Sequence, residues 1–154
     1  MSDEGNLLTL ETTKGEVVIR LRPDLAPNHV AHIKKLVGEK FYDGVVFHRV
    51  IEGFMAQTGC PHGTGTGGSK YPNLKAEFNN APHVRGTASM ARAASPDSAN
   101  SQFFICFAPA PFLNGQYTVF GEVVSGMEFV DKIKRGEPPA TPDKIISLKP
   151  ASDA

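Results

Sequence analysis

Arg49 stands among apolar residues that offer it no evident partner. It lies within residues 47–59, FHRVIEGFMAQTG, and in a strand it would share a face with Phe47 and Ile51. A guanidinium is permanently charged and is almost never fully buried without a partner, and the nearest acid, Glu52, falls on the opposite parity. The default interpretation is a rim residue whose aliphatic stem covers apolar surface. The alternative is a fixed hydrogen-bond donor that acts on a bound molecule.

Apolar and amide side chains suited to a binding surface recur along the chain. Phe112 and Leu113 lie in a proline-flanked loop, where large hydrophobic side chains are expected only if they pack or bind. Taken singly, Phe54 and Phe104 are typical core residues, and Met55 is a typical gap-filler. The set that accompanies Arg49 comprises Phe54, Met55, Gln57, Gln102, Phe104, Phe112 and Leu113.

Three other chemistries are not supported by the motifs that suggest them. Residues 62–70, HGTGTGGSK, contain G-x-G-x-x-G, but that fingerprint needs a helix at its last glycine, which Pro72 and Asn73 resist. The five histidines and Cys60 do not form the spaced ligand pairs of a zinc site. The serine-rich stretch lacks a G-x-S-x-G elbow. The sequence therefore predicts no nucleotide, metal or nucleophile site.

The charge balance excludes several partners. The chain has 154 residues, with 16 Lys plus Arg and 16 Asp plus Glu, and is 40% hydrophobic. Nucleic acid and anionic membranes both select an excess of positive charge, so neither is expected as a partner. The first residues lack the basic region and apolar run of a secretory signal. We expect one globular domain, residues 1–154, monomeric and cytoplasmic, with Cys60 and Cys106 as free thiols.

The elements that must position these side chains are short. Residues 7–21 predict a hairpin, residues 28–38 a helix with one apolar stripe, and residues 127–134 a second helix. Further strands are predicted at 45–51, 54–57, 86–90, 103–107, 118–124 and 145–148. His29 and His32 are expected on the solvated face of the first helix. The absence of strand–helix alternation favours a mainly β fold, an eight-stranded antiparallel closed β-barrel capped by two α-helices.

Four stretches, in this order, resemble the cyclophilins, the peptidyl-prolyl cis–trans isomerases: FHRVIEGFMAQTG, GTGTGG, SQFFICF and FLNGQYTVFGEV. The resemblance runs from about Leu8 to about Leu148 and is most specific in FHR-x-I-x-GFM-x-Q together with SQFFI. The chain is similar to the short, single-domain, bacterial-type form. The resemblance implies the same capped barrel, a shallow apolar proline pocket on its outer face, and no cofactor or metal.

The resemblance also implies roles for individual residues. Arg49 matches the catalytic arginine, and Gln57 is placed to orient it. The matching substrate-binding positions are Phe54, Met55, Gly65, Ala91, Arg92, Ala93, Gln102, Phe104, Phe112, Leu113 and Tyr117. Arg92 stands where eukaryotic members have asparagine, a position that contacts substrate through its backbone, and Tyr117 stands where many have histidine. Phe112 replaces a common tryptophan whose indole N–H is a donor to cyclosporin, so weaker binding of this inhibitor is expected.

These roles imply catalysis without covalent chemistry. A twisted X–Pro amide loses resonance, and its pyramidal nitrogen becomes an acceptor for a donor such as Arg49. The expected partners are proline-containing peptides and unfolded or flexible protein segments, and the expected role is assistance in protein folding. The same pocket would also suit a module that binds proline without turning it over, or a holding chaperone that uses exposed apolar surface.

Overall fold

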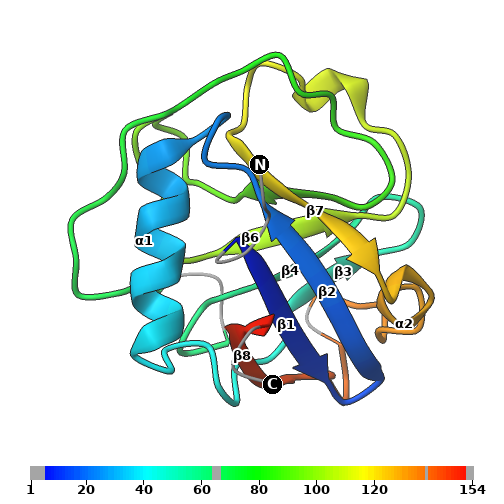
Figure 1. The fold of residues 1–154 in the computed structure, drawn as a ribbon. Coiled ribbons are helices and arrows are strands. Elements are labelled where there is room, and N and C mark those ends of the chain that lie inside the picture. Colours follow the sequence, from blue (N-terminus) through cyan, green and yellow to red (C-terminus); the bar gives the residue numbers. More distant parts are fainter. Residues whose placement is uncertain (1–5, 64–66, 138, 152–154) are drawn as a thin grey trace.

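One curled antiparallel sheet of eight strands forms the centre of the molecule (Figure 1). The computed structural model describes residues 6–63, 67–137 and 139–151. The strands are β1 (Leu7–Thr12), β2 (Gly15–Leu21), β3 (Arg49–Ile51), β4 (Met55–Thr58), β5 (Thr87–Met90), β6 (Phe103–Cys106), β7 (Val119–Ser125) and β8 (Ile145–Pro150). They pair in the order β3-β4-β6-β5-β7-β2-β1-β8, and every pair is antiparallel. The predicted mainly β, eight-stranded architecture is confirmed.

The predicted closed barrel overstates how the sheet ends meet. Within the described residues β3 and β8 do not pair as strands; Val46 and Lys144 form an isolated bridge between the two ends. The outer edge of β3 is taken instead by Gly136, whose backbone exchanges two hydrogen bonds of 2.8 Å with Val50. The sheet is therefore a curled half-barrel with a short seam. The predicted strand 45–51 is reduced to Arg49–Ile51, because only these residues pair with β4.

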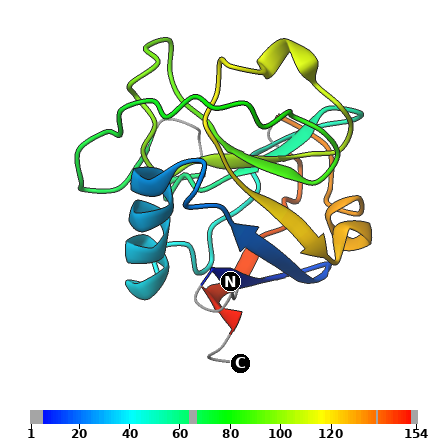
Figure 2. The same ribbon diagram turned by 45° about the horizontal axis from the view of Figure 1, so that its top comes forward.

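Two helices lie on opposite sides of the sheet, as the two views show: α1 (Pro27–Gly38) and α2 (Met127–Val130) (Figures 1 and 2). A short 3-10 turn, η1, covers Pro111–Leu113. The second helix is shorter than the predicted 127–134, because the chain continues through turns after Val130. Among the residues described, no helix is long and apolar enough to cross a membrane.

The apolar stripe of α1 is buried as predicted, but its histidines are buried too. His29 is fully buried and His32 is 8% exposed, so the expected solvated face is wrong. The reason is Glu77, whose carboxylate accepts hydrogen bonds from the backbone N–H of Asn28 and His29 and lies 2.6 Å from His29 Nδ1. This distant carboxylate caps the start of α1, where the N-cap residue Ala26 provides no side-chain cap.

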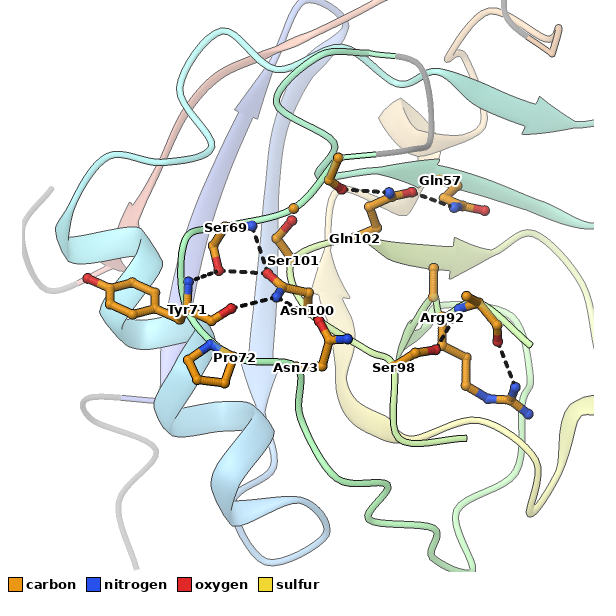
Figure 3. A pocket seen from close by; sticks show the side chains of 14 residues that line it. Gln57, Ser69, Tyr71, Pro72, Asn73, Arg92, Ser98, Asn100, Ser101 and Gln102 are labelled. Carbon is orange, nitrogen blue, oxygen red and sulfur yellow. Dashed lines mark hydrogen bonds between the residues drawn. The ribbon is translucent and has the colours of Figure 1, made fainter. Parts of the chain in front are cut away.

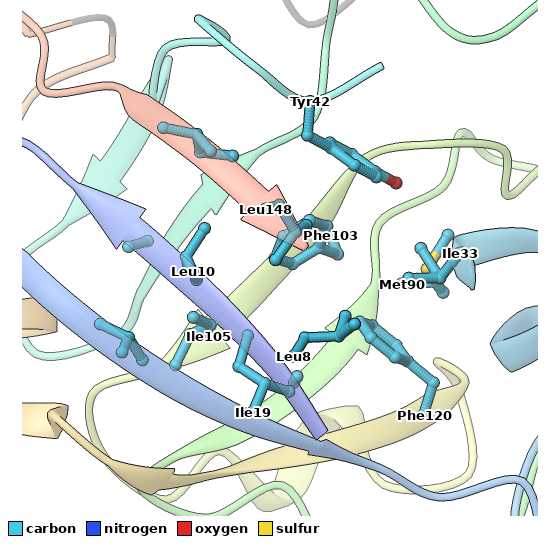
Figure 4. Close-up of a cluster of buried hydrophobic side chains, with 14 of the residues drawn as sticks. Leu8, Leu10, Ile19, Ile33, Tyr42, Met90, Phe103, Ile105, Phe120 and Leu148 are labelled. Carbon is cyan, nitrogen blue, oxygen red and sulfur yellow. The ribbon is translucent and has the colours of Figure 1, made fainter. Parts of the chain in front are cut away.

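The core lies inside the curled sheet and beneath α1. The labelled side chains of Figure 4 converge there from α1, from six of the strands and from the turn after α1: Leu8, Leu10, Ile19, Ile33, Tyr42, Met90, Phe103, Ile105, Phe120 and Leu148. Phe103 meets Tyr42 and Phe120 edge-on, with ring centroids 5.6 and 5.8 Å apart. Burying a side chain of this size contributes about 1.5–3 kcal/mol. This packing holds β6 in place, and the outer face of the same strand carries the site.

Candidate functional site

The outer face of β4 and β6 carries a second apolar cluster, separate from the core. Because side chains alternate along a strand, Phe103 and Ile105 enter the core while Phe104 and Cys106 join this outer cluster. Met55 stands opposite Cys106 in the β4–β6 register. The cluster comprises Met55, Phe104, Cys106, Ala110 and Leu113, with Ile51, Phe54, Ala91 and Tyr117 packed against it.

A hollow of about 110 Å³ opens on this cluster. It is lined by Arg49, Phe54, Met55, Gln57, Ala91, Arg92, Phe104, Leu113 and Tyr117, all of them residues predicted from the sequence. Tyr117 meets Phe104 edge-on, with ring centroids 5.9 Å apart. The hollow is therefore walled by aromatic and aliphatic side chains on one side and by a guanidinium and an amide on the other.

Three predicted residues lie outside the lining of the hollow, and a fourth is not described. Phe112 is 69% exposed and packs on Phe54 at the rim, with ring centroids 5.6 Å apart. Ala93 and Gln102 line an adjoining groove. Gly65 lies outside the described residues.

Arg49 is held at the edge of the hollow by two groups. Arg49 faces Gln57 across the β3–β4 pair, and one terminal nitrogen donates to Gln57 Oε1 at 3.3 Å. Its Nε donates to Glu137 Oε1, also at 3.3 Å. In the described part of the chain the second terminal nitrogen has no protein acceptor, which leaves it for a bound molecule. Phe47 does not share this side, since it belongs to the core, whereas Ile51 packs against the outer cluster.

Gln57 is itself held by a chain of amides. Its Nε2 donates to Gln102 Oε1 at 3.0 Å, and Gln102 Nε2 donates to the carbonyl oxygen of Gly67 at 2.9 Å. These bonds fix which end of the Gln57 amide faces the guanidinium. The oxygen of Gln57 is thereby presented to Arg49, and the relay runs from the loop at Gly67 to the hollow.

The adjoining groove is larger and more polar, with a volume of about 540 Å³ (Figure 3). Asn100 organises one wall: its Oδ1 accepts from the backbone N–H of Ser69 at 2.7 Å, and its Nδ2 donates to the carbonyl oxygen of Tyr71 at 2.9 Å. Gln57, Ala91 and Arg92 line both cavities. The full lining is Gln57, Gly67, Gly68, Ser69, Tyr71, Pro72, Asn73, Ala91, Arg92, Ala93, Ser98, Asn100, Ser101 and Gln102.

Arg92 forms the partition between hollow and groove. Its guanidinium donates to the carbonyl oxygen of Gln116 at 2.8 and 3.1 Å and to that of Ala93 at 3.0 Å. It also lies 4.5 Å from the centre of the Tyr117 ring. The sequence predicted a role for the backbone of Arg92; the structure adds a side chain that ties the loop at Ala93 to the loop at Gln116.

His83, which the sequence did not single out, supports Phe104 from behind. The two rings are stacked with centroids 6.1 Å apart. Nδ1 of His83 lies 3.1 Å from Asn114 Oδ1, and Nε2 lies 2.9 Å from Ser89 Oγ. Burial lowers the pKa of His83 below its usual value, which outweighs the hydrogen bond to Asn114. A neutral imidazole held at both nitrogens fixes the aromatic floor; no local pattern marks it in the sequence.

The titratable groups around the hollow favour noncovalent chemistry. Burial raises the pKa of Cys106 to about 12, so its thiol stays protonated at neutral pH and is a poor nucleophile. His48 is buried, and burial together with the charge of Arg49 lowers its pKa. No group of three or more His, Cys, Asp or Glu able to hold a metal ion occurs among the described residues. The hollow thus offers a permanent cation and an amide against an apolar wall.

Comparisons with known proteins agree with this geometry. The family model described as "Cyclophilin type peptidyl-prolyl cis-trans isomerase/CLD" matches residues 7–150. A probable peptidyl-prolyl cis-trans isomerase of Brucella suis is 55% identical over 168 aligned positions, covering 99% of this chain and 86% of that protein. Peptidyl-prolyl cis-trans isomerase B of Bacillus subtilis is 50% identical, covering 79% of this chain and 85% of that protein.

Solved structures that superpose on this chain are cyclophilins. The cyclophilin AquaCyp293 from Hirschia baltica superposes with a TM-score of 0.90 at 31% identity, covering all of this chain and 76% of that one. A cyclophilin type isomerase from Cryptosporidium parvum, crystallised in the presence of the dipeptide Ala-Pro, superposes with a TM-score of 0.86 at 28% identity. That alignment covers 93% of this chain and 97% of the other.

Proposed function

This chain belongs to the cyclophilin-type peptidyl-prolyl cis–trans isomerases, and we propose that it turns over X–Pro bonds by stabilising the twisted amide from Arg49. The barrier to rotation is roughly 18–20 kcal/mol because amide resonance must be lost. Uncatalysed exchange takes tens to hundreds of seconds. A 10⁵-fold acceleration corresponds to roughly 7 kcal/mol of transition-state stabilisation.

The supporting observation is the position of the Arg49 guanidinium at the edge of an apolar hollow, with one terminal nitrogen left for a ligand. In the twisted state the proline nitrogen becomes pyramidal and gains acceptor character. A donor aimed at that nitrogen binds the twisted amide better than either planar isomer, which is the requirement for catalysis by differential binding. A preorganised charged donor beside apolar walls contributes a few kcal/mol of the total.

The other residues of the site take supporting roles. The proline ring fits against Phe104, Met55 and Leu113, which fixes one side of the rotating bond. Gln57 holds the guanidinium, and Gln102 holds Gln57. No proton transfer or covalent intermediate is needed, which agrees with the protonated thiol of Cys106.

We propose proline-containing peptides and flexible or unfolded protein segments as substrates, with assistance in protein folding as the role. The solved relative crystallised with Ala-Pro supports a proline ligand. Because the hollow is small and shallow, it selects proline strongly and leaves the neighbouring residues to the groove. The free thiols of Cys60 and Cys106 suit a reducing compartment such as the cytoplasm, and we expect a single-domain monomer.

Arg49→Ala tests this proposal against a module that only binds proline. We expect kcat/KM for a short X–Pro peptide to fall about 10²- to 10³-fold, while the peptide dissociation constant changes only a few-fold. Arg85→Ala is the matched control, because Arg85 is also an exposed arginine paired with one acid, Asp131. Peptide exchange followed by NMR measures both isomerisation and binding. A wild-type protein that binds the peptide but leaves its exchange rate unchanged would establish the binding module instead.

A further inference from the structure

We propose that Glu137 is a positioning residue for catalysis, which holds the Arg49 guanidinium in the plane that presents its second terminal nitrogen to the proline nitrogen. This inference rests on the proposed function of Arg49. It starts from the contact between Arg49 Nε and Glu137 Oε1, 3.3 Å apart, formed by residues 88 positions apart in the sequence.

The segment that carries Glu137 is fixed against β3 by its backbone. Val50 and Gly136 exchange two hydrogen bonds of 2.8 Å. Gly136 has a φ of +147°, a backbone conformation that residues with a side chain rarely adopt. The carboxylate of Glu137 is therefore placed by a bridged backbone rather than by the ion pair that it forms.

Two anchors on different nitrogens define the orientation of a planar group. Gln57 accepts from one terminal nitrogen of Arg49 and Glu137 accepts from Nε. A single contact would leave the guanidinium free to turn about that contact, whereas two contacts fix its plane and the direction of the remaining N–H donors. The arginine side chain is long and has many rotamers, and the Arg49 side chain is 45% exposed. Without the second anchor it would sample directions away from the hollow.

The exposure of the pair argues for positioning rather than for stability. The side chains of Arg49 and Glu137 are 45% and 57% exposed, and pairs of this kind contribute little to folding because water and salt screen them. The acid also opposes the charge that Arg49 offers to the twisted amide, but this opposition is screened in the same way. Orientation is the larger effect, since a hydrogen bond to the proline nitrogen depends steeply on direction.

Three variants test the proposal. Glu137→Ala is expected to lower kcat/KM for a short X–Pro peptide about tenfold, and Glu137→Gln only about two- to threefold, since the amide oxygen still accepts from Nε. Peptide affinity should stay within about twofold in both, because the apolar wall that binds the ring is unchanged. Glu52→Ala is the matched control: it removes another exposed acid of the same surface, which pairs with Arg135 rather than with Arg49, and should leave kcat/KM unchanged.

Two further measurements separate positioning from a general structural effect. In an Arg49→Ala background, Glu137→Ala should cause no additional loss of kcat/KM. In the presence of Arg49, Glu137→Ala should speed hydrogen exchange of the Arg49 Nε–H signal in NMR spectra, and Glu52→Ala should not. The proposal is overturned if Glu137→Ala matches Glu52→Ala in kcat/KM, raises it, or lowers it equally without Arg49. If Arg49→Ala itself keeps full activity, the proposed role of Arg49 fails as well, so the two failures are distinguishable.

Discussion

On β6, Phe103 and Ile105 face the core, whereas the intervening Phe104 and the following Cys106 face the outer cluster, and all four are buried. Burial therefore does not distinguish the two faces. What distinguishes them is the neighbourhood: Phe103 meets two other core rings, while Phe104 forms the floor of a hollow edged by Arg49. A single strand thus contributes to the core with one face and to the candidate site with the other.

Replacing Phe103 or Phe104 by alanine should give the largest difference between the two faces of β6, one change acting on stability and the other on activity. Phe103→Ala is expected to lower the free energy of unfolding by about 3–5 kcal/mol, because it leaves a cavity among packed rings. Phe104→Ala should cost less stability, since its face opens on solvent at the hollow, but should lower kcat/KM at least about tenfold in folded protein. Denaturant unfolding and peptide exchange measure the two effects. Equal loss of activity in the two folded variants would contradict the division of faces.

Gln57→Ala tests whether the outer face depends on its polar relay. Loss of the acceptor for Arg49 and of the link to Gln102 should lower kcat/KM by about tenfold. The free energy of unfolding should fall by less than about 1 kcal/mol, because these hydrogen bonds lie at the partly exposed end of the hollow. The rate of cis–trans exchange of an X–Pro peptide, measured at limiting and at saturating peptide concentration, gives kcat/KM and kcat separately. Unaltered kcat/KM would show that Arg49 needs no orientation by this amide.

Acid should lower the stability of the fold through the Glu77 cap of α1, while the charge of Arg49 at the hollow stays unchanged. Burial raises the pKa of Glu77, but the hydrogen bonds from His29 and Asn28 lower it more, so the net pKa is below its ordinary value. The resulting stabilisation is present above the ordinary glutamate pKa, near 4.3, and is lost as pH falls through the lower folded value. Arg49 keeps its charge throughout.

Glu77→Gln isolates this effect. It should lower the free energy of unfolding at pH 7 by about 1 kcal/mol and reduce its fall below pH 4.3. Glu11→Gln, at an exposed position on β1, is the control and should keep the wild-type profile. The free energy of unfolding is measured by denaturant titration at roughly pH 3 to 7, a range that spans the ordinary glutamate pKa. If Glu77→Gln kept the wild-type pH profile of unfolding, protonation of the Glu77 cap of α1 would not be the cause of the loss of stability in acid.

Phe112→Trp tests the contribution of the rim of the hollow to cyclosporin affinity, and its expected effect is the smallest. Phe112 is 69% exposed and packs against Phe54 with the two rings tilted, so a larger ring has room there. The added indole N–H should tighten cyclosporin binding by up to about tenfold, the worth of one hydrogen bond. Phe78→Trp, at another exposed phenylalanine, is the control. Isothermal titration with cyclosporin gives the affinities; wild-type binding as tight as that of Phe112→Trp would contradict the predicted weakness.

Much of the site was predictable because its residues come from strands with simple alternation and from motif segments. Arg49, Gln57 and Phe104 were named from the sequence, and the structure brings them to one hollow. The boundaries of the irregular segments were not predictable in the same way. The strand expected at 45–51 begins only at Arg49, because its pairing with β4 covers Arg49–Ile51 alone and the preceding Val46 forms only an isolated bridge to the distant Lys144.

By itself the sequence determined the mainly β architecture and the apolar and amide residues of the candidate site. These depend on local periodicity and on motifs, which one stretch of chain contains in full. Only the tertiary structure decided that Glu137 contacts Arg49, that Glu77 caps α1 over a buried His29, and that the two ends of the curled sheet meet only at an isolated bridge. Each of these joins residues far apart in the chain, and their proximity follows from backbone pairing and packing that no local pattern encodes.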